Sequence, residues 1–293
     1  MKFDDERTTT PEGHSRRGIL GWLAGGVASG MAWLSAGSLL RSKEAVAAPP
    51  GTPALPTVPG SDIVRMQEEL QAALTRPLNS RRWGMVIDPR RCTGCNTCVI
   101  SCRAENVTGP EGSYRRVAEA SAGRYPDVTR VFMPSNCVQC DDPPCQRAVP
   151  EGMIRKRPDG IVEFDYTKLT GTYAQKAAEA CPYRAVHVDQ GKLFTSGTPA
   201  VQAYEKRNFV EYQREWNRTN GSLPTGAARK CHFCLHRLNV GMLPSCVTTC
   251  VGLATYFGDA NDPESLVSEL IAKPNVMRLK EEMGTEPKVY YLV

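Results

Sequence analysis

The chain has 293 residues, of which 41% are hydrophobic, and its 36 basic and 31 acidic side chains leave a formal net charge of +5. A chain of this length can bury a core of its own, which argues against a small disulfide-held scaffold despite the 12 cysteines. The sequence contains no P-loop, nucleophile elbow or C-x-x-C-H haem motif, which removes several classes of catalytic site.

The first 47 residues are predicted to be a twin-arginine export signal. Residues 15–20 read SRRGIL, residues 19–40 carry no charge, and Ala45-Val46-Ala47 fits the small-x-small cleavage pattern, so we expect removal after Ala47. This route exports folded proteins, which predicts a periplasmic location for the mature chain. An uncleaved membrane anchor is the alternative, because the uncharged segment is long enough to span a bilayer.

Residues 48–60 contain five prolines and are predicted to form an extended tether. Residues 61–293 follow as the folded domain. Its first predicted element is a helix that runs from Ser61 towards Arg76 and is ended by Pro77.

Short apolar stretches further along are predicted strands, separated by cysteine loops and brief helices. The expected strands are residues 83–87, 131–133, 161–164 and 186–188, with one helix ending at Ala180 and another starting at residues 262–264. This repeated alternation is typical of ferredoxins and predicts an α+β fold of two interleaved ferredoxin-like units with cysteine-loop cluster sites.

A polar insert covers about residues 190–228, and residues 201–217 within it are predicted to form an exposed helix. Four aromatic side chains on this helix either face a partner or cover a small core of the insert: Tyr204, Phe209, Tyr212 and Trp216.

The 12 cysteines fall into four groups. The first has the C-x2-C-x2-C-x3-C spacing of bacterial ferredoxins and consists of Cys92, Cys95, Cys98 and Cys102. The last group is also complete, with Cys231, Cys234, Cys246 and Cys250. The second group has Cys137, Cys140 and Cys145, but Val149 stands at its fourth position. The third keeps only Cys181, with Gly171, Ala174 and Ala177 at the other three positions.

In paired ferredoxin motifs, the first three cysteines hold one cluster and the fourth belongs to the cluster of the other motif. Only the pairing of the first motif with the last, and of the second with the third, leaves no cysteine over. The resulting sets are Cys92, Cys95, Cys98 and Cys250; Cys231, Cys234, Cys246 and Cys102; and Cys137, Cys140, Cys145 and Cys181. The sequence therefore predicts three 4Fe-4S clusters in a fold built for four, with the lost cluster at one end of the array.

Structural zinc is an alternative for these cysteines, because paired C-x-x-C motifs also form tetrahedral thiolate sites. His232 and His236 are expected to donate hydrogen bonds near the clusters or to lie at the surface, rather than to be ligands. Three oxidised clusters at about −2 each would make the holoprotein slightly acidic, so we expect no nucleic-acid partner. With every ligand supplied by the chain, the clusters would transfer electrons, and the chain would have no catalytic site of its own.

Four segments resemble the four-motif iron-sulfur subunits of membrane-bound respiratory oxidoreductases: residues 83–92, 140–145, 181–183 and 231–237. The resemblance implies docking on an integral membrane quinone-interacting subunit and electron exchange with a periplasmic cytochrome or other redox subunit. Within this family, the chain is most similar to DsrO, the periplasmic iron-sulfur subunit of the sulfite-reductase-associated Dsr transmembrane complex. Two alternatives stay open: the electron-transfer subunit of a molybdenum-dependent polysulfide- or tetrathionate-type reductase, and a zinc-stabilised assembly module.

Overall fold

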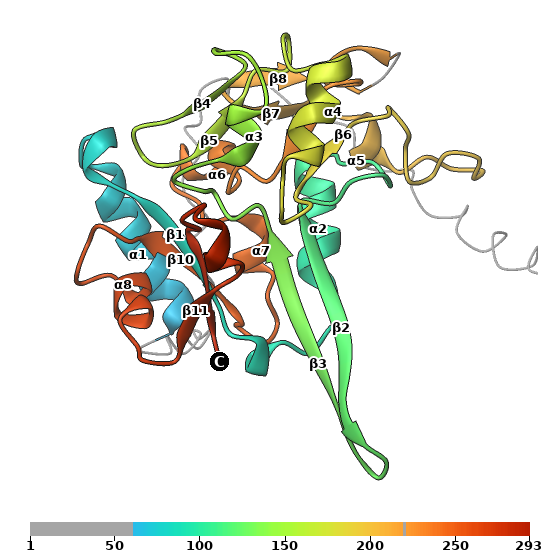
Figure 1. Cartoon of the computed structure of the whole chain (residues 1–293). Helices are drawn as coiled ribbons and strands as arrows, with labels where there is room; N and C mark the ends of the chain where they lie inside the picture. The colour runs from blue at the N-terminus through green and yellow to red at the C-terminus, as the bar shows by residue number, and fades with distance from the viewer. Residues whose placement is uncertain (1–60, 219–220) are drawn as a thin grey trace, which may run out of the picture. The chain divides into compact units, whose positions relative to one another are not determined.

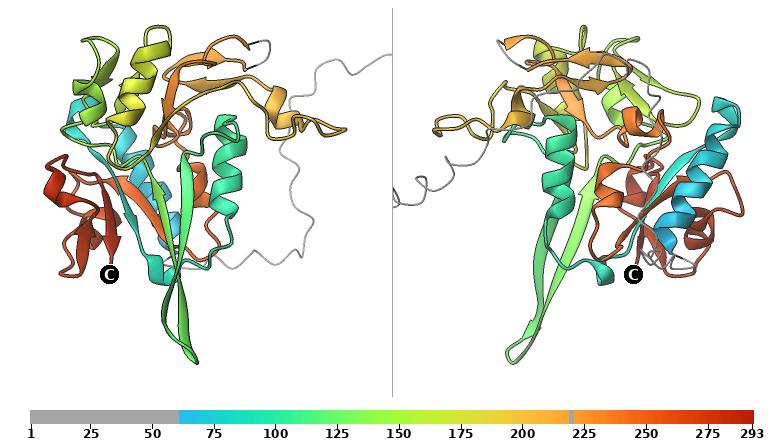
Figure 2. Two further views of the ribbon diagram at one scale, coloured as in Figure 1. Left: turned by 45° about the vertical axis from the view of Figure 1, so that its right-hand side comes forward. Right: turned by 180° about the vertical axis from the view of Figure 1, so that it is seen from behind.

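The computed structural model describes residues 61–218 and 221–293, so the predicted signal and tether lie outside the described residues. The described residues belong to one compact unit, traced in Figures 1 and 2. Its helices are α1 Asp62–Leu74, α2 Thr97–Asn106, α3 Pro144–Arg147, α4 Gly171–Glu179, α5 Ala203–Lys206, α6 Leu235–Leu238, α7 Ser245–Thr248 and α8 Leu266–Ile271. Its strands are β1 Trp83–Ile87, β2 Arg115–Arg124, β3 Asp127–Asn136, β4 Ile154–Lys156, β5 Val162–Phe164, β6 Val186–Val188, β7 Phe209–Glu211, β8 Arg214–Trp216, β9 Ala228–Lys230, β10 Thr255–Asp259, β11 Val276–Arg278 and β12 Val289–Leu292. Among these helices, none is both long and apolar enough to cross a membrane.

The largest sheet has the strand order β10-β1-β12-β11. β1 pairs antiparallel with β10, which places Met85 opposite Phe257, and it pairs parallel with β12. All five residues of β1 are buried, which explains its uninterrupted apolar run. The predicted helix after Ser61 is confirmed as α1, which packs against β10 (Figure 1) and buries Met66, Leu70 and Ala73.

A long antiparallel hairpin, β2–β3, extends away from this sheet (Figure 2). Its register runs from Arg115 opposite Asn136 at the base to Arg124 opposite Asp127 at the tip. The outer residues are exposed, whereas Arg115 and Asn136 are 1% and 3% exposed. The base of the hairpin therefore carries a polar pair into the protein interior. The predicted strand at residues 131–133 is confirmed, but it is only part of the longer β3.

The predicted helix over residues 201–217 is wrong. Only the four-residue helix α5 forms there, and β7 and β8 then make a hairpin with Phe209 opposite Trp216. Residues of β7 alternate buried, exposed, buried, and this two-residue period overrides the helical spacing of the aromatic residues. The turn is made by Tyr212 and Gln213, whose φ angles of 52° and 63° are typical of a tight hairpin turn.

The other predicted elements agree more closely with the structure. β5, β6 and α4 form where expected. Helix α8 begins at Leu266, slightly after the predicted start, because the Ser265 hydroxyl caps it by accepting a hydrogen bond from the Ser268 N–H. Helices and strands are mixed along the whole described chain, and the interleaving of two ferredoxin-like units stays a prediction.

Candidate iron-sulfur cluster sites

Three cavities in the folded domain are each lined by four cysteines. Site A has Cys92, Cys95, Cys98 and Cys250; site B has Cys102, Cys231, Cys234 and Cys246; site C has Cys137, Cys140, Cys145 and Cys181. Each grouping equals one of the sets obtained by counting motifs. All 12 cysteines are free of disulfide bonds. Within residues 61–218 and 221–293, no three Cys, His, Asp or Glu side chains converge on a point suited to a single metal ion.

Helices α2 and α7 pack together and explain how sites A and B share cysteines. Helix α2 brings Cys98 to site A and Cys102, one turn later, to site B. Helix α7 brings Cys246 to site B, while Cys250, just past its end, lines site A. Because residues four apart lie on the same face of a helix, each helix reaches two neighbouring sites. Sites A and B are therefore adjacent.

Helices α3 and α4 pack together in the same way but serve only one site. Cys145 on α3 and Cys181 just past α4 both line site C. Ala174 and Ala177 on α4 are fully buried in the apolar core, and Val149 packs against that core. Apolar side chains thus take the place of the thiols that a fourth site would need.

Eight of the twelve cysteines are buried, Cys92, Cys181 and Cys250 are half-buried, and Cys95 is exposed; sulfurs of all three sites accept hydrogen bonds from the backbone. One N–H donates to a sulfur in each site: Ala254 N to Cys250 Sγ at 3.1 Å, Phe233 N to Cys231 Sγ at 3.4 Å, and Ala185 N to Cys181 Sγ at 3.4 Å. Burial, with a neighbouring thiolate adding to it, raises the pKa of Cys140, Cys145 and Cys234 to about 12. Buried thiolates therefore need a cationic group beside them, and the iron ions of a 4Fe-4S core fit that requirement.

Arg115, at the base of the β2–β3 hairpin, lines both site A and site B. Its guanidinium donates to Asn136 Oδ1 and to Thr255 Oγ1, each at 2.7 Å. Burial alone would lower the pKa of Arg115, but the thiolates of Cys246 and Cys98 raise it above its ordinary value. No sequence motif marks Arg115, because it lies between motifs and only the hairpin register brings it to the sites.

Two adjacent basic residues of β9 lie in different electrostatic surroundings. Lys230 is fully buried and lines site C, and its Nζ donates to the carbonyl oxygen of Cys231, a site B residue, at 3.0 Å. Arg229, also fully buried, forms ion pairs with Glu211 at 2.9 Å and Asp189 at 2.7 Å. Arg229 thus ties the insert to β9, whereas Lys230 faces the cysteines.

The carboxylates paired with Arg229 belong to a wider buried network. Asp189 also accepts from Arg218 at 2.8 Å, and Glu211 accepts from Tyr114 Oη at 2.8 Å. Burial alone would raise the pKa of Glu211, but the Arg229 guanidinium holds it well below its usual range. Asp189 is likewise shifted below its usual pKa, against the effect of burial, by Arg229 and Arg218. Both carboxylates are therefore charged at neutral pH.

The two histidines of the last motif bond to protein groups. His232 Nδ1 accepts from the Leu235 N–H at 2.8 Å, and its Nε2 lies 3.5 Å from Glu211 Oε1. His236 Nε2 lies 2.8 Å from Glu105 Oε1. His232 is fully buried and lines site B, so a surface position, one of the two expected for it, is wrong.

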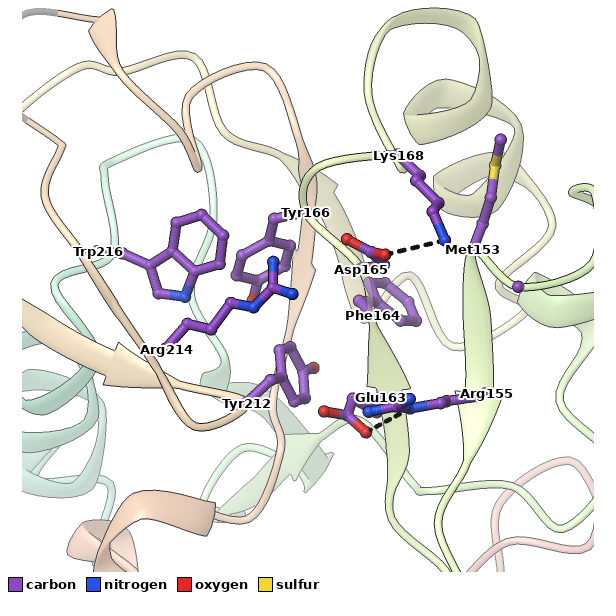
Figure 3. Close-up of a pocket in the computed structure, with 11 residues that line it drawn as sticks. Met153, Arg155, Glu163, Phe164, Asp165, Tyr166, Lys168, Tyr212, Arg214 and Trp216 are labelled. Atoms are coloured by element: carbon purple, nitrogen blue, oxygen red, sulfur yellow. Dashed lines mark hydrogen bonds and ion pairs between the residues drawn. The ribbon is translucent and has the colours of Figure 1, made fainter.

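A further cavity of about 150 Å³ lies between the β4–β5 and β7–β8 hairpins, and no cysteine lines it (Figure 3). The Tyr166 ring makes edge-to-face contacts with Tyr212 and Trp216, with centroids 5.4 and 5.3 Å apart. Phe209 is buried, and the guanidinium carbon of Arg229 lies over its ring, 4.8 Å from the centroid of the Phe209 ring. Of the two interpretations left open for the insert's aromatic residues, these contacts favour coverage of a local core.

Comparison with known proteins gives consistent matches. A family described as 4Fe-4S dicluster domain matches residues 128–197 and 214–260. Over 230 residues, the chain is 52% identical to a subunit of the selenate reductase of Mesobacillus selenatarsenatis, covering 78% of each chain. It is 33% identical to the arsenate respiratory reductase iron-sulfur subunit ArrB of a Shewanella species, covering 72% of this chain and 96% of that one. It is 34% identical to a subunit of the tetrathionate reductase of Salmonella typhimurium, covering 72% of each.

Proposed function

This chain belongs to the family of reductase iron-sulfur subunits that carry a 4Fe-4S dicluster domain, and we propose that it holds three 4Fe-4S clusters and relays electrons within a membrane-associated reductase complex. The observation that carries the proposal is the division of all 12 cysteines, in fours, among three cavities. Each cluster, when bound, accepts and releases one electron. The chain's own residues hold the clusters in place, exclude water and set their electrostatic surroundings.

The arrangement of the sites supports one continuous route. Sites A and B share the wall residue Arg115. Sites B and C meet where Gln139 Nε2 donates to the carbonyl oxygen of Cys231 at 2.6 Å, beside Lys230. The filled fourth position involves only α3, α4 and the residues next to them, so it lies on the site C side. This supports a lost cluster that is terminal, with the remaining three still in series as A, B and C.

The named relatives support the partners and the substrate class of the complex. They include subunits of selenate, arsenate, tetrathionate and polysulfide reductases, and an iron-sulfur cluster-binding subunit of a menaquinone reductase. We therefore infer a molybdenum-dependent catalytic partner that acts on an oxyanion or a sulfur compound, and a quinone-interacting membrane subunit. These relatives favour this reading over the DsrO-like one. Export by the twin-arginine route to the periplasm is part of the same proposal.

Reduction of the clusters by a quinol tests the relay. Membranes that contain the complete complex are incubated anaerobically with a menaquinol analogue, and cluster reduction is followed by EPR, with and without the terminal oxyanion acceptor. We expect reduction that requires the membrane subunit and reoxidation that requires the acceptor. A complex that turns over while these clusters stay in one redox state would exclude the chain from the electron route.

A further inference from the structure

Four basic side chains of the described chain are almost completely buried: Arg115, Arg218, Arg229 and Lys230. Arg218 and Arg229 form ion pairs with Asp189 and Glu211. Within residues 61–218 and 221–293, Arg115 and Lys230 have no carboxylate partner at ion-pair distance, and their polar contacts are with neutral groups. A buried charge without a counter-charge is strongly disfavoured, so these two cations require a further partner.

The first of the two cations lies where sites A and B meet. Arg115 lines both cavities and is 1% exposed. Its two terminal nitrogens bond to Asn136 and Thr255, but its Nε is buried and has no hydrogen-bond partner in the part of the chain that the structure describes. An unsatisfied N–H of a buried guanidinium, beside two sets of thiols, indicates an anionic group that belongs in the cavities.

The second cation lies where sites B and C meet. Lys230 lines site C, and its Nζ donates to the carbonyl oxygen of Cys231, whose thiol lines site B. Its other contacts are Gln139 Oε1 at 3.4 Å and the Phe164 ring, with the centroid at 5.1 Å. Each junction between neighbouring sites thus holds one cation without an acidic partner among the described residues.

We propose that Arg115 and Lys230 are the counter-charges of the iron-sulfur clusters, and that each raises the reduction potentials of the two clusters it borders. The inference rests on the proposed three-cluster function. An oxidised cluster with its four thiolates carries about −2, and reduction adds one more negative charge. A fixed cation nearby stabilises the reduced form more than the oxidised form, and it also offsets repulsion between adjacent clusters.

This assignment predicts a specific pattern. Arg115 borders sites A and B, and Lys230 borders sites C and B. Removing either charge should therefore lower two of the three midpoint potentials, and only the site B cluster should respond to both changes. Arg116 provides a matched control, because it is the next residue of β2 but is exposed and donates to the carbonyl oxygen of Tyr183. Solvent screens a charge at such a position.

The test is an EPR-monitored redox titration of the anaerobically purified holoprotein and of the variants Arg115→Gln, Lys230→Gln, Arg115→Lys, Lys230→Arg and Arg116→Gln. For each Gln variant at a buried position, we expect the equilibrium constants for one-electron reduction of two clusters to fall about tenfold. This corresponds to midpoint potentials lower by about 59 mV. The midpoint potential of the site B cluster should be lowered in both Arg115→Gln and Lys230→Gln. The charge-preserving variants and Arg116→Gln should stay within about threefold of the wild type.

Each outcome decides the question. Gln variants that keep all three clusters with unchanged midpoints would overturn the assignment, as would equal shifts in all three clusters. If Arg115→Gln loses clusters while Arg115→Lys loads fully with near-wild-type midpoints, the charge itself is required and the assignment stands. If both variants lose clusters, shape rather than charge is responsible, and the assignment fails. A wild-type protein without three clusters would instead refute the proposed function.

Discussion

Substitution of Arg229 by Met should release the insert from the domain. The change removes ion pairs to Glu211 and Asp189 and the hydrogen bonds to the carbonyl oxygens of Asn106 and Val107, at 2.7 and 3.2 Å. Asp189 keeps Arg218, but among the described residues Glu211 is left in the interior with two neutral tyrosine donors, Tyr114 and Tyr166, and His232 nearby. Removing one partner of a buried ion pair costs about 3–5 kcal/mol.

Hydrogen exchange of the holoprotein measures this cost where it acts. At 1.36 kcal/mol per factor of ten, amide protection over residues 203–216 should fall roughly 150-fold or more. Protection in β1, in the central sheet, should change little. The control variant is Arg130→Met, which breaks the pair with Glu119, whose partners are 68% and 49% exposed. Such an exposed pair is worth about 1 kcal/mol or less, so its loss should lower protection less than about fivefold.

A loss of protection below about fivefold in residues 203–216 of Arg229→Met, with full iron content, would refute this role of Arg229. A loss of equal size in β1 would also contradict it, because the network would then support the whole domain rather than the insert. Adding Glu211→Gln to Arg229→Met should recover part of the loss, since the second change removes the uncompensated charge.

Three further changes test separate parts of the structure. Cys102→Ala and Cys231→Ala should both remove the site B cluster and lower iron from about 12 to about 8 per chain, whereas Cys98→Ala should remove a different EPR signal. Loss of the same EPR signal in Cys98→Ala and Cys102→Ala would contradict the assignment of these two cysteines to different clusters. Glu211 and Asp189 have lowered pKa values in the fold, so their stabilisation is complete above about pH 4 and is lost as the pH falls further. The urea midpoint of the wild type should thus drop more than that of Glu211→Gln between about pH 6 and pH 3, and parallel curves would contradict this. Ala177→Leu, in the filled fourth position, should lower the free energy of unfolding in urea by about 1–3 kcal/mol, because the larger side chain overfills a buried position. The exposed control Gln175→Leu should lower it by less than about 0.5 kcal/mol. Equal urea midpoints for the two variants would mean that the position of Ala177 is not tightly packed.

The cysteine groupings could be predicted from sequence because cluster chemistry constrains them. A ligand set needs four thiols, and the exchange of fourth ligands between motifs leaves one arrangement with none unused. The structure gives the mechanical reason: α2 presents Cys98 and Cys102 one turn apart, and each reaches a different cavity. Helix α1 and strand β1 were predictable for a simpler reason, because their apolar patterns match one period clearly.

The insert and the buried cations could not be predicted in this way. Phe209, Tyr212 and Trp216 fit a helical spacing as well as an alternating one, and the choice depends on the tight turn at residues 212–213 and on the pairing of Glu211 with Arg229. Arg115 looks like any basic residue of a polar hairpin. Only its register opposite Asn136 and the position of the hairpin base bring it to sites A and B.

The central claim is that this chain holds three 4Fe-4S clusters. The most direct test is the amount of iron, acid-labile sulfide and zinc per polypeptide in protein that is expressed with its N-terminal segment and purified without oxygen. We expect about 12 iron and 12 sulfide with negligible zinc. About 4 iron, or zinc in stoichiometric amounts, would contradict it and would indicate a metal-stabilised assembly module instead.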